Sequence, residues 1–325
     1  MEYKRKVLPD VIKIICTLCI LFHHYQQLTG TFFYRGINFY GGKFYFGYLV
    51  ELFFIMSGWV MVSYIDRIKD NMTFPAFISK RLIRLLPSMI VSTVAYDVLL
   101  FVFTKYCNGT IRYPQKIDIF GSIITSLGMG SWCITKDYEI NTINWYVSVL
   151  LLCYIIFYIL VFISKISKIP TAILFVIPVI AGVIRTYGME YSFLPFFSPR
   201  IARGYIHFFG GLLLGIIFIS LFGHIKKKEK EENKTVITVK KIIGYISEAT
   251  LDVYLLQLPV LFGFFIFSYY TNFKLVSGKT MLLFTAVTFL IGCLYHFLVG
   301  KRIYVLLSGI LKKSGKAKNR AQKPI

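Results

Sequence analysis

Two adjacent histidines stand near the end of a long apolar segment, in the stretch FHHYQ at residues 22–26. An imidazole takes up and releases a proton near neutral pH, which is the chemistry of a general base. Adjacent residues of a helix point about 100° apart, so His23 and His24 cannot both face one cavity. The plain alternative is that both are interfacial side chains at a helix end.

Glu51 opens the stretch ELFFIMSG, six residues into a second apolar segment. We assume that the first segment enters the membrane from the cytoplasm and the second returns. His24 then lies roughly 22 Å from the cytoplasmic edge of a ~30 Å core, which is about 8 Å from its outer edge. Glu51 lies about 9 Å from the same outer edge. These levels coincide, so we predict a His24–Glu51 pair in which the carboxylate orients the imidazole, provided that the two helix faces meet. Near mid-membrane, Ser57 and Gly58 either permit close helix contact or leave room for a thin substrate arm.

A basic cluster of Lys80, Arg81 and Arg84 lies in SKRLIRLLP, at the start of a third apolar segment. Arg81 and Arg84 are three residues apart, so they share a helix face. Paired guanidinium groups suit phosphate or carboxylate oxygens, and a helix amino terminus adds a favourable dipole. The plain alternative is that the cluster anchors this helix at the cytoplasmic face.

Ionisable residues inside a membrane are costly, so each one is a candidate for function. Asp97 lies in the third apolar segment, and Asp252 and Gln257 lie in TLDVYLLQLPV. A buried aspartate needs a partner, for which Lys13, Arg185 and a histidine all remain open. We expect no bound metal.

The segments that carry these residues have the composition of membrane helices. Of 325 residues, 56% are hydrophobic, above the 45–50% that is usual in soluble domains. The apolar residues form blocks of about 20 without two-residue alternation, which favours helices over a β-barrel. We therefore predict an all-α, polytopic transmembrane helix bundle. Its eight clear spans are 9–29, 45–65, 84–104, 143–163, 169–187, 204–222, 249–269 and 280–299.

The segment 117–131 is shorter and rich in glycine. A re-entrant segment, an interfacial segment and a short span all remain open for it. We expect one membrane domain over residues 1–311, followed by a basic cytoplasmic tail at 312–325.

The formal net charge is +22, and 26 of the 37 Lys and Arg residues fall on one side of the predicted topology. This is the positive-inside bias, and it places both termini in the cytoplasm. The basic runs are expected to face anionic lipid headgroups, so we do not expect a nucleic-acid partner. The Lys- and Ile-rich composition indicates a bacterial plasma membrane.

Several stretches, in order along the chain, resemble the membrane acyltransferase-3 family, whose members O-acylate sugars and lipids. The first is an acidic and a basic residue followed by a histidine, here Asp10, Lys13 and His24. The second is an acidic residue before FFxxSG, here Glu51 with FFIMSG. The third is RxxRxxP, here Arg81, Arg84 and Pro87. Later similar stretches are NWYVSVLLLCY at 144–154, RGYIHFFGGLLLG at 203–215 and SEATLDVYLLQLP at 247–259.

The resemblance implies about ten membrane helices with the amino terminus inside. It also implies that an acyl group, commonly acetyl, passes from cytoplasmic acyl-CoA to a hydroxyl of a cell-surface polysaccharide or lipid-linked glycan. Acyl-CoA would be a substrate, and no cofactor would be bound permanently. The arginines, helped by Lys80 and Lys13, would bind the donor, and His24 would act in acyl transfer.

Three positions depart from the family's pattern. The usual arginine of the first segment is Lys13, which loses bidentate geometry. Many family members carry a glutamate five residues after the tryptophan, and this chain has Leu150 at that position. A histidine that is common in the last stretch is replaced here by Gln257. A sugar or lipid transporter without acyl transfer is the alternative function, because a polytopic bundle with buried ionisable residues suits transport too.

Overall fold

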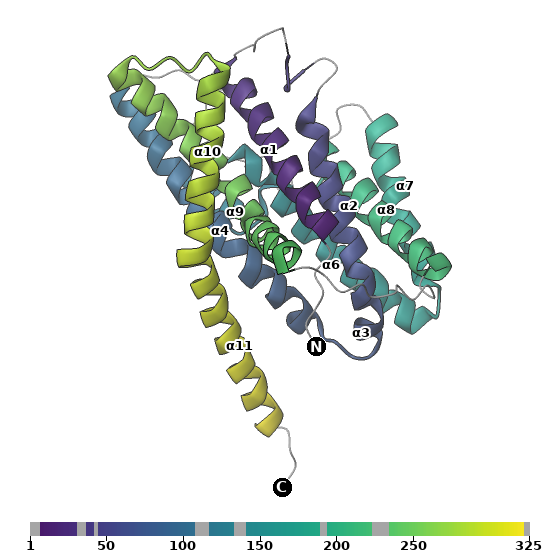
Figure 1. The fold of residues 1–325 in the computed structure, drawn as a ribbon. Helices are drawn as coiled ribbons and strands as arrows, with labels where there is room; N and C mark the ends of the chain where they lie inside the picture. Colours follow the sequence, from purple (N-terminus) through teal and green to yellow (C-terminus); the bar gives the residue numbers. More distant parts are fainter. Residues whose placement is uncertain are drawn as a thin grey trace.

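The computed structural model describes residues 7–30, 37–41, 45–107, 117–132, 141–188, 194–222 and 234–321. These ranges contain helices and no strand, which confirms the all-α prediction (Figure 1). The α-helices are α1 (Val7–Thr29), α2 (Leu49–Met61), α3 (Ile65–Lys69), α4 (Phe74–Tyr106), α5 (Ile119–Ser126), α6 (Trp145–Ser167), α7 (Thr171–Tyr187), α8 (Pro199–Phe222), α9 (Lys234–Thr271), α10 (Gly278–Tyr295) and α11 (Lys301–Ala321).

Seven helical segments within the described residues are long and apolar enough to cross a membrane. They cover seven of the eight predicted spans. The remaining predicted span, 169–187, is the 17-residue apolar helix α7, which is shorter than these seven. We call the end of the bundle where α1 begins the inner end, after the predicted topology, and the opposite end the outer end.

Helices α2 and α8 pack with their backbones close together. A Cβ atom added to Gly58 would collide with the backbone oxygen of Phe208, and one added to Gly211 would collide with the backbone of Ile55. Small residues allow this approach because nothing stands between the two backbones. Gly58 therefore serves helix packing, and the alternative that it leaves room for a substrate arm is wrong.

The segment 117–132 enters the bundle and turns back. Asp118 caps α5 by accepting a hydrogen bond from the Phe120 amide at 3.0 Å. The chain reverses at Gly128, whose positive φ of 74° suits glycine. It then returns to α6, where the Trp132 indole donates to the Ser148 carbonyl at 2.9 Å. Helix α5 has eight residues, too few to cross a ~30 Å core, so the short-span alternative is wrong. We call 117–132 the re-entrant segment because the chain reverses within it.

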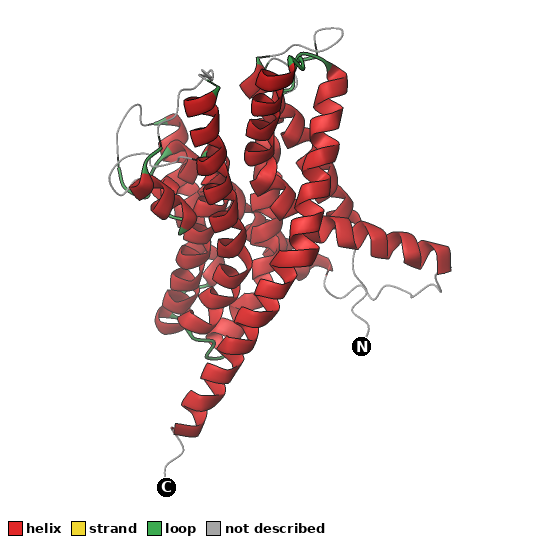
Figure 2. Cartoon of the chain, turned by 90° about the vertical axis from the view of Figure 1, so that its left-hand side faces the viewer, coloured by secondary structure: helices red, strands yellow, loops and turns green. Residues whose placement is uncertain are grey.

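The last helices form one long continuous run. In Figure 1, α10 continues directly into α11. The single turn between them, η7 (His296–Gly300), is π-helical. Helix α11 continues past residue 311 to Ala321, so the predicted boundary before the basic tail lies within a helix. At the inner half of the bundle, the first turns of α9 project sideways (Figure 2).

Candidate functional site

His24 is held in one orientation by α9. Its Nδ1 lies 3.0 Å from Oε1 of Gln257. The Gln257 amide is itself fixed, because its Nε2 donates to the Tyr254 carbonyl at 2.7 Å. Since Oε1 is an acceptor, Nδ1 of His24 carries the proton, and Nε2 is left with its lone pair. His24 is only half-buried. A half-buried imidazole with a free basic nitrogen is suited to remove a proton from a substrate.

His23 has different partners, although its ring centre lies 5.1 Å from that of His24. Its side chain is buried, and its Nδ1 contacts the Phe39 carbonyl at 3.0 Å. Its ring packs edge-on against Tyr40 and Tyr45. The expected divergence of the two histidines is therefore present. His23 holds the segment before α2 against α1.

Glu51 lies at the outer end of α2 but does not pair with His24. Its Oε1 accepts from Nε of Arg203 at 3.0 Å, and its Oε2 lies 3.1 Å from Nε2 of His207. Both partners stand on α8. The predicted His24–Glu51 pair is therefore wrong, because α2 turns this carboxylate toward α8 and α9 supplies the partner of His24.

Arg81 is buried in an aromatic cage. Its Nη1 donates to the Phe77 carbonyl at 2.7 Å, and its Nη2 contacts the Met61 sulfur at 3.3 Å. The guanidinium carbon lies 3.7 Å from the ring centre of Phe77 and 4.2 Å from that of Tyr64. Stacking of this kind suits arginine better than lysine. Because its guanidinium is enclosed, Arg81 has a structural role in helix packing at the inner end.

Arg84 and Lys80 are exposed at the same end. Arg84 makes no ion pair with any residue in the ranges that the structure describes, and its charge acts on Tyr146 and Tyr154. The two arginines that the sequence groups together are thus in different surroundings. Arg84 is accessible to a ligand, and Arg81 supports the neighbouring helices.

Tyrosines of α6 connect the two ends of the bundle. Tyr146 and Tyr154 both interact with Ser57 of α2. Tyr146 lies 5.8 Å, between ring centres, from Tyr254, whose ring lies 6.5 Å from that of His24. A path from His24 toward Arg84 along these tyrosines therefore runs through side chains that are almost fully buried. A ligand that follows this line has to displace tyrosine side chains.

Asp10 and Lys13 lie together on α1 near the inner end. The Lys13 ammonium is 3.8 Å from Oδ1 of Asp10, and the same oxygen accepts from Ser247 of α9 at 2.7 Å. This contact ties the beginning of α1 to α9. Along α9, Ser247 and Gln257 therefore both contact α1, one at each end of the shared surface.

The partner of Asp252 is a histidine, one of the three alternatives that the sequence left open for a buried aspartate. Its Oδ2 lies 2.6 Å from Nδ1 of His296, in the π-helical turn. Asp97 of α4 lies near Ser122 of α5, so it faces the re-entrant segment, and Oδ1 of Asp97 and Oγ of Ser122 have no hydrogen-bond partner among the described residues. Neither aspartate contacts His24, and the structure does not bring them into the same site.

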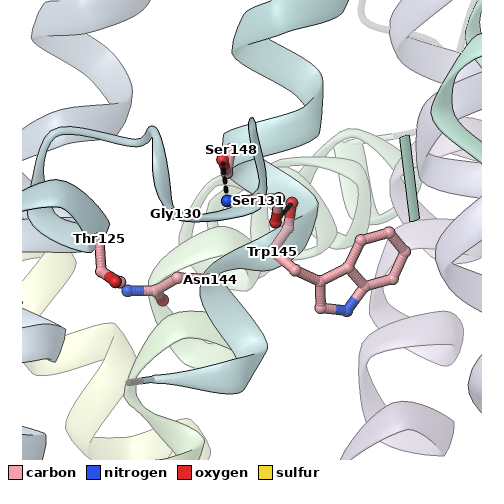
Figure 3. Close-up of a pocket in the computed structure, with 6 residues that line it drawn as sticks. All are labelled: Thr125, Gly130, Ser131, Asn144, Trp145 and Ser148. Atoms are coloured by element: carbon pink, nitrogen blue, oxygen red, sulfur yellow. Dashed lines mark hydrogen bonds between the residues drawn. The ribbon is translucent and has the colours of Figure 1, made fainter. Parts of the chain in front are cut away.

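Trp145 is the first residue of α6 and is buried. It lines a small pocket, too narrow for a water molecule, between the re-entrant segment and α6 (Figure 3). In this pocket the Ser131 amide donates to Oγ of Ser148 at 3.0 Å. On its other side, the Trp145 ring packs 5.0 Å from the Arg203 guanidinium carbon. Trp145 thus separates a closed polar pocket from the Glu51 network.

Sequence reasoning missed Arg203, His207 and His296 as site residues. All three are ionisable residues within helices that are long enough to cross a membrane. The rule that marked Asp97 and Asp252 as candidates applies to them equally. Arg203 and His207 are also four residues apart, which places them on one face of α8.

Comparison with known proteins agrees with the family indicated by the motifs. A family model described as an acyltransferase domain matches residues 8–218. This region holds His24, Glu51, both arginines of α4 and the network on α8. No curated protein and no solved structure matches the chain.

Proposed function

We propose, from the premise that the chain belongs to the acyltransferase-3 family, that it is an integral-membrane O-acyltransferase. It moves an acyl group, most simply acetyl, from cytoplasmic acyl-CoA to a hydroxyl of a cell-surface polysaccharide or lipid-linked glycan. Its location is the bacterial plasma membrane, with both termini in the cytoplasm. The observation that carries the proposal is the fixed His24–Gln257 contact, which leaves a basic nitrogen available.

The reaction needs one proton acceptor and a close approach of the two substrates. Nε2 of His24 removes the proton of the acceptor hydroxyl, and the oxygen attacks the thioester carbonyl. The C–S bond breaks as the C–O bond forms, and the proton passes to the departing thiolate of coenzyme A. A general base contributes roughly 10²–10⁴-fold to such a reaction.

Gln257 performs the orienting role that we had assigned to Glu51. A neutral amide accepts the Nδ1 proton without supplying charge, so the imidazole stays a neutral base in the resting enzyme. This arrangement also gives a use to the glutamine that stands where related chains carry histidine. Gln257 is a positioning residue, because it acts through His24.

The donor binds at the inner end through Arg84 and Lys80. Both are exposed, and phosphate oxygens match the geometry of a guanidinium group. The pantetheine arm then follows the tyrosines of α6 toward His24. Because Tyr146 and Tyr154 occupy this line, their side chains move when the donor binds.

Acyl transfer is distinguished from transport by the fate of a labelled donor. Membranes that contain the protein are incubated with acetyl-CoA labelled in the acetyl group. We expect label in glycan or lipid as an ester that mild alkali releases, and no such label with His24→Ala. Label that stays on coenzyme A, in the presence of a glycan-rich extract, would support the transporter alternative.

A further inference from the structure

The network of Glu51, Arg203 and His207 carries an excess positive charge. Arg203 donates to Glu51 through Nε and to the Gly47 carbonyl through Nη2 at 2.9 Å. Nδ1 of His207 lies 2.7 Å from the Arg203 carbonyl, which is an acceptor only, so Nδ1 donates. One proton must then lie between Nε2 of His207 and the Glu51 carboxylate, since both atoms are otherwise acceptors. Whether it is bound to His207 or to Glu51, the summed charge of these two residues is zero. Arg203 adds one positive charge in either case.

This charge has no second carboxylate among the residues that the structure describes. The ion pairs of Arg203 and His207 there all lead to Glu51. Arginines near the end of a membrane helix usually extend their charge toward water. Arg203, in the first turns of α8, instead turns to α2, and 28% of its side chain stays exposed. An excess charge that is partly removed from water is stabilised by a counter-anion, and the exposed part of Arg203 leaves an anion access to it.

The surroundings of Arg203 fit a sugar. Its guanidinium carbon lies 5.0 Å from the ring centre of Trp145 and 5.8 Å from that of Tyr48, which is exposed. Trp145 is buried, whereas the exposed Tyr48 offers a flat aromatic face of the kind that stacks against the C–H face of a sugar ring. No contact within the described residues occupies Nη1 of Arg203, so the guanidinium retains donors for an incoming oxyanion.

The network also lies beside the proposed base. The charge of Arg203 acts on His23 and on Tyr254, and both rings pack near His24. Arg200, one turn earlier on α8, acts on Tyr254 as well. Arg203 and His24 therefore share His23 and Tyr254 as neighbours, so that a single acceptor molecule can reach both.

We propose that Arg203 binds a negatively charged group, a carboxylate or a phosphate, on the sugar that accepts the acyl group. This rests on the proposed function and narrows its acceptor to anionic sugars. Glu51 and His207 are positioning residues, because Glu51 accepts from Nε of Arg203 and His207 contacts the other oxygen of Glu51.

The test measures sugar binding to the full chain in phosphatidylcholine nanodiscs by isothermal titration. The probes are methyl β-glucuronide, glucose 1-phosphate and the neutral methyl β-glucoside. We expect at least one anionic probe to bind at least tenfold more tightly than the glucoside. Arg203→Gln should remove this preference. Lys105→Gln is the matched control, because it removes a positive charge of the outer end of α4 that lies outside the network, and it should leave the preference unchanged.

His207→Gln keeps a donor toward Glu51 but lowers the network charge by one. It provides a second test if Arg203→Gln does not fold, and it too should weaken anion binding at least tenfold. Equal affinity for charged and neutral sugars, or an unchanged preference in both variants, would overturn the proposal. So would loss of sugar binding when phosphatidylglycerol replaces phosphatidylcholine, because the site would then bind a lipid headgroup.

Binding of acetyl-CoA in the same discs separates this inference from the proposed function. None of these variants touches the inner end, so donor affinity should not change. If acetyl-CoA does not bind at all, the proposed function fails while an anion preference at Arg203 can still stand. If acetyl-CoA binds and the anion preference is absent, only the inference about the acceptor fails.

Discussion

Oε1 of Gln257 accepts the Nδ1 proton of His24 across the interface of α1 and α9, at 3.0 Å. The Tyr254 carbonyl holds the glutamine amide in this orientation. Replacing Gln257 by Leu removes the acceptor and frees both the tautomer and the rotation of the ring. We expect kcat to fall about tenfold or more, with little change in KM for acyl-CoA.

Gln257→Glu is the matched variant, because a carboxylate still accepts from Nδ1 although it loses the donor to the Tyr254 carbonyl. It should restore part of the activity that Gln257→Leu loses. Steady-state acetyl transfer with purified protein gives both constants. If the Leu variant keeps the kcat of the wild type, Gln257 does not position the base.

The two histidines should differ in what their removal costs. His24→Ala removes the base, so we expect a loss of roughly 10²–10⁴-fold in kcat, with normal insertion and thermal unfolding. His23→Ala removes a buried contact to Phe39, so its main effect should be a lower unfolding temperature. Equal losses of kcat at unchanged stability would contradict this division.

Substitutions of the two arginines of α4 should likewise have different effects, one on donor binding and the other on stability. Arg84→Gln removes an exposed guanidinium, and we expect KM for acyl-CoA to rise about tenfold to a hundredfold, since a hydrogen bond to a charged group contributes about 1.5–3 kcal/mol. Arg81→Gln opens the aromatic cage and should lower thermal stability. A larger rise in KM for Arg81→Gln than for Arg84→Gln would show that Arg81 leaves its cage to bind the donor.

Close packing of α2 on α8 predicts a strong local effect at Gly58. Gly58→Ala forces a methyl group against the Phe208 carbonyl, and overpacking of this kind costs about 1–3 kcal/mol. Gly210→Ala on α8 is the control, because no atom lies within 4 Å of its added Cβ. Thermal unfolding in detergent should show a destabilised Gly58→Ala and an unaffected Gly210→Ala. Equal unfolding temperatures would contradict the packing described.

Depth along a helix was predictable from the sequence, and direction around the helix was not. Counting residues placed His24 and Glu51 correctly near the outer end. The partners of His24 and Glu51 depend on how α1 and α2 are rotated about their axes. Packing against α9 and α8 determines this rotation, and no local sequence pattern predicts it. The sequence also contained Gln257 as a candidate, but its link to His24 crosses 233 residues.

Spacing on one helix face was likewise insufficient for Arg81 and Arg84. A separation of three residues predicts a shared face, and both side chains do approach Tyr154. Their exposure differs because Met61 and Tyr64, from the end of α2 and the turn after it, enclose only Arg81. The helical spans were easier to predict, since they follow from apolar length alone.

The most direct measurement uses sealed proteoliposomes in which the protein has one orientation, with labelled acetyl-CoA on the inner side and glycan acceptor only on the outer side. The account predicts that ester-linked label appears on the outer glycan, that it disappears with His24→Ala, and that it needs more donor with Arg84→Gln. Full transfer by His24→Ala, or transfer only when donor and acceptor share one side, would contradict it.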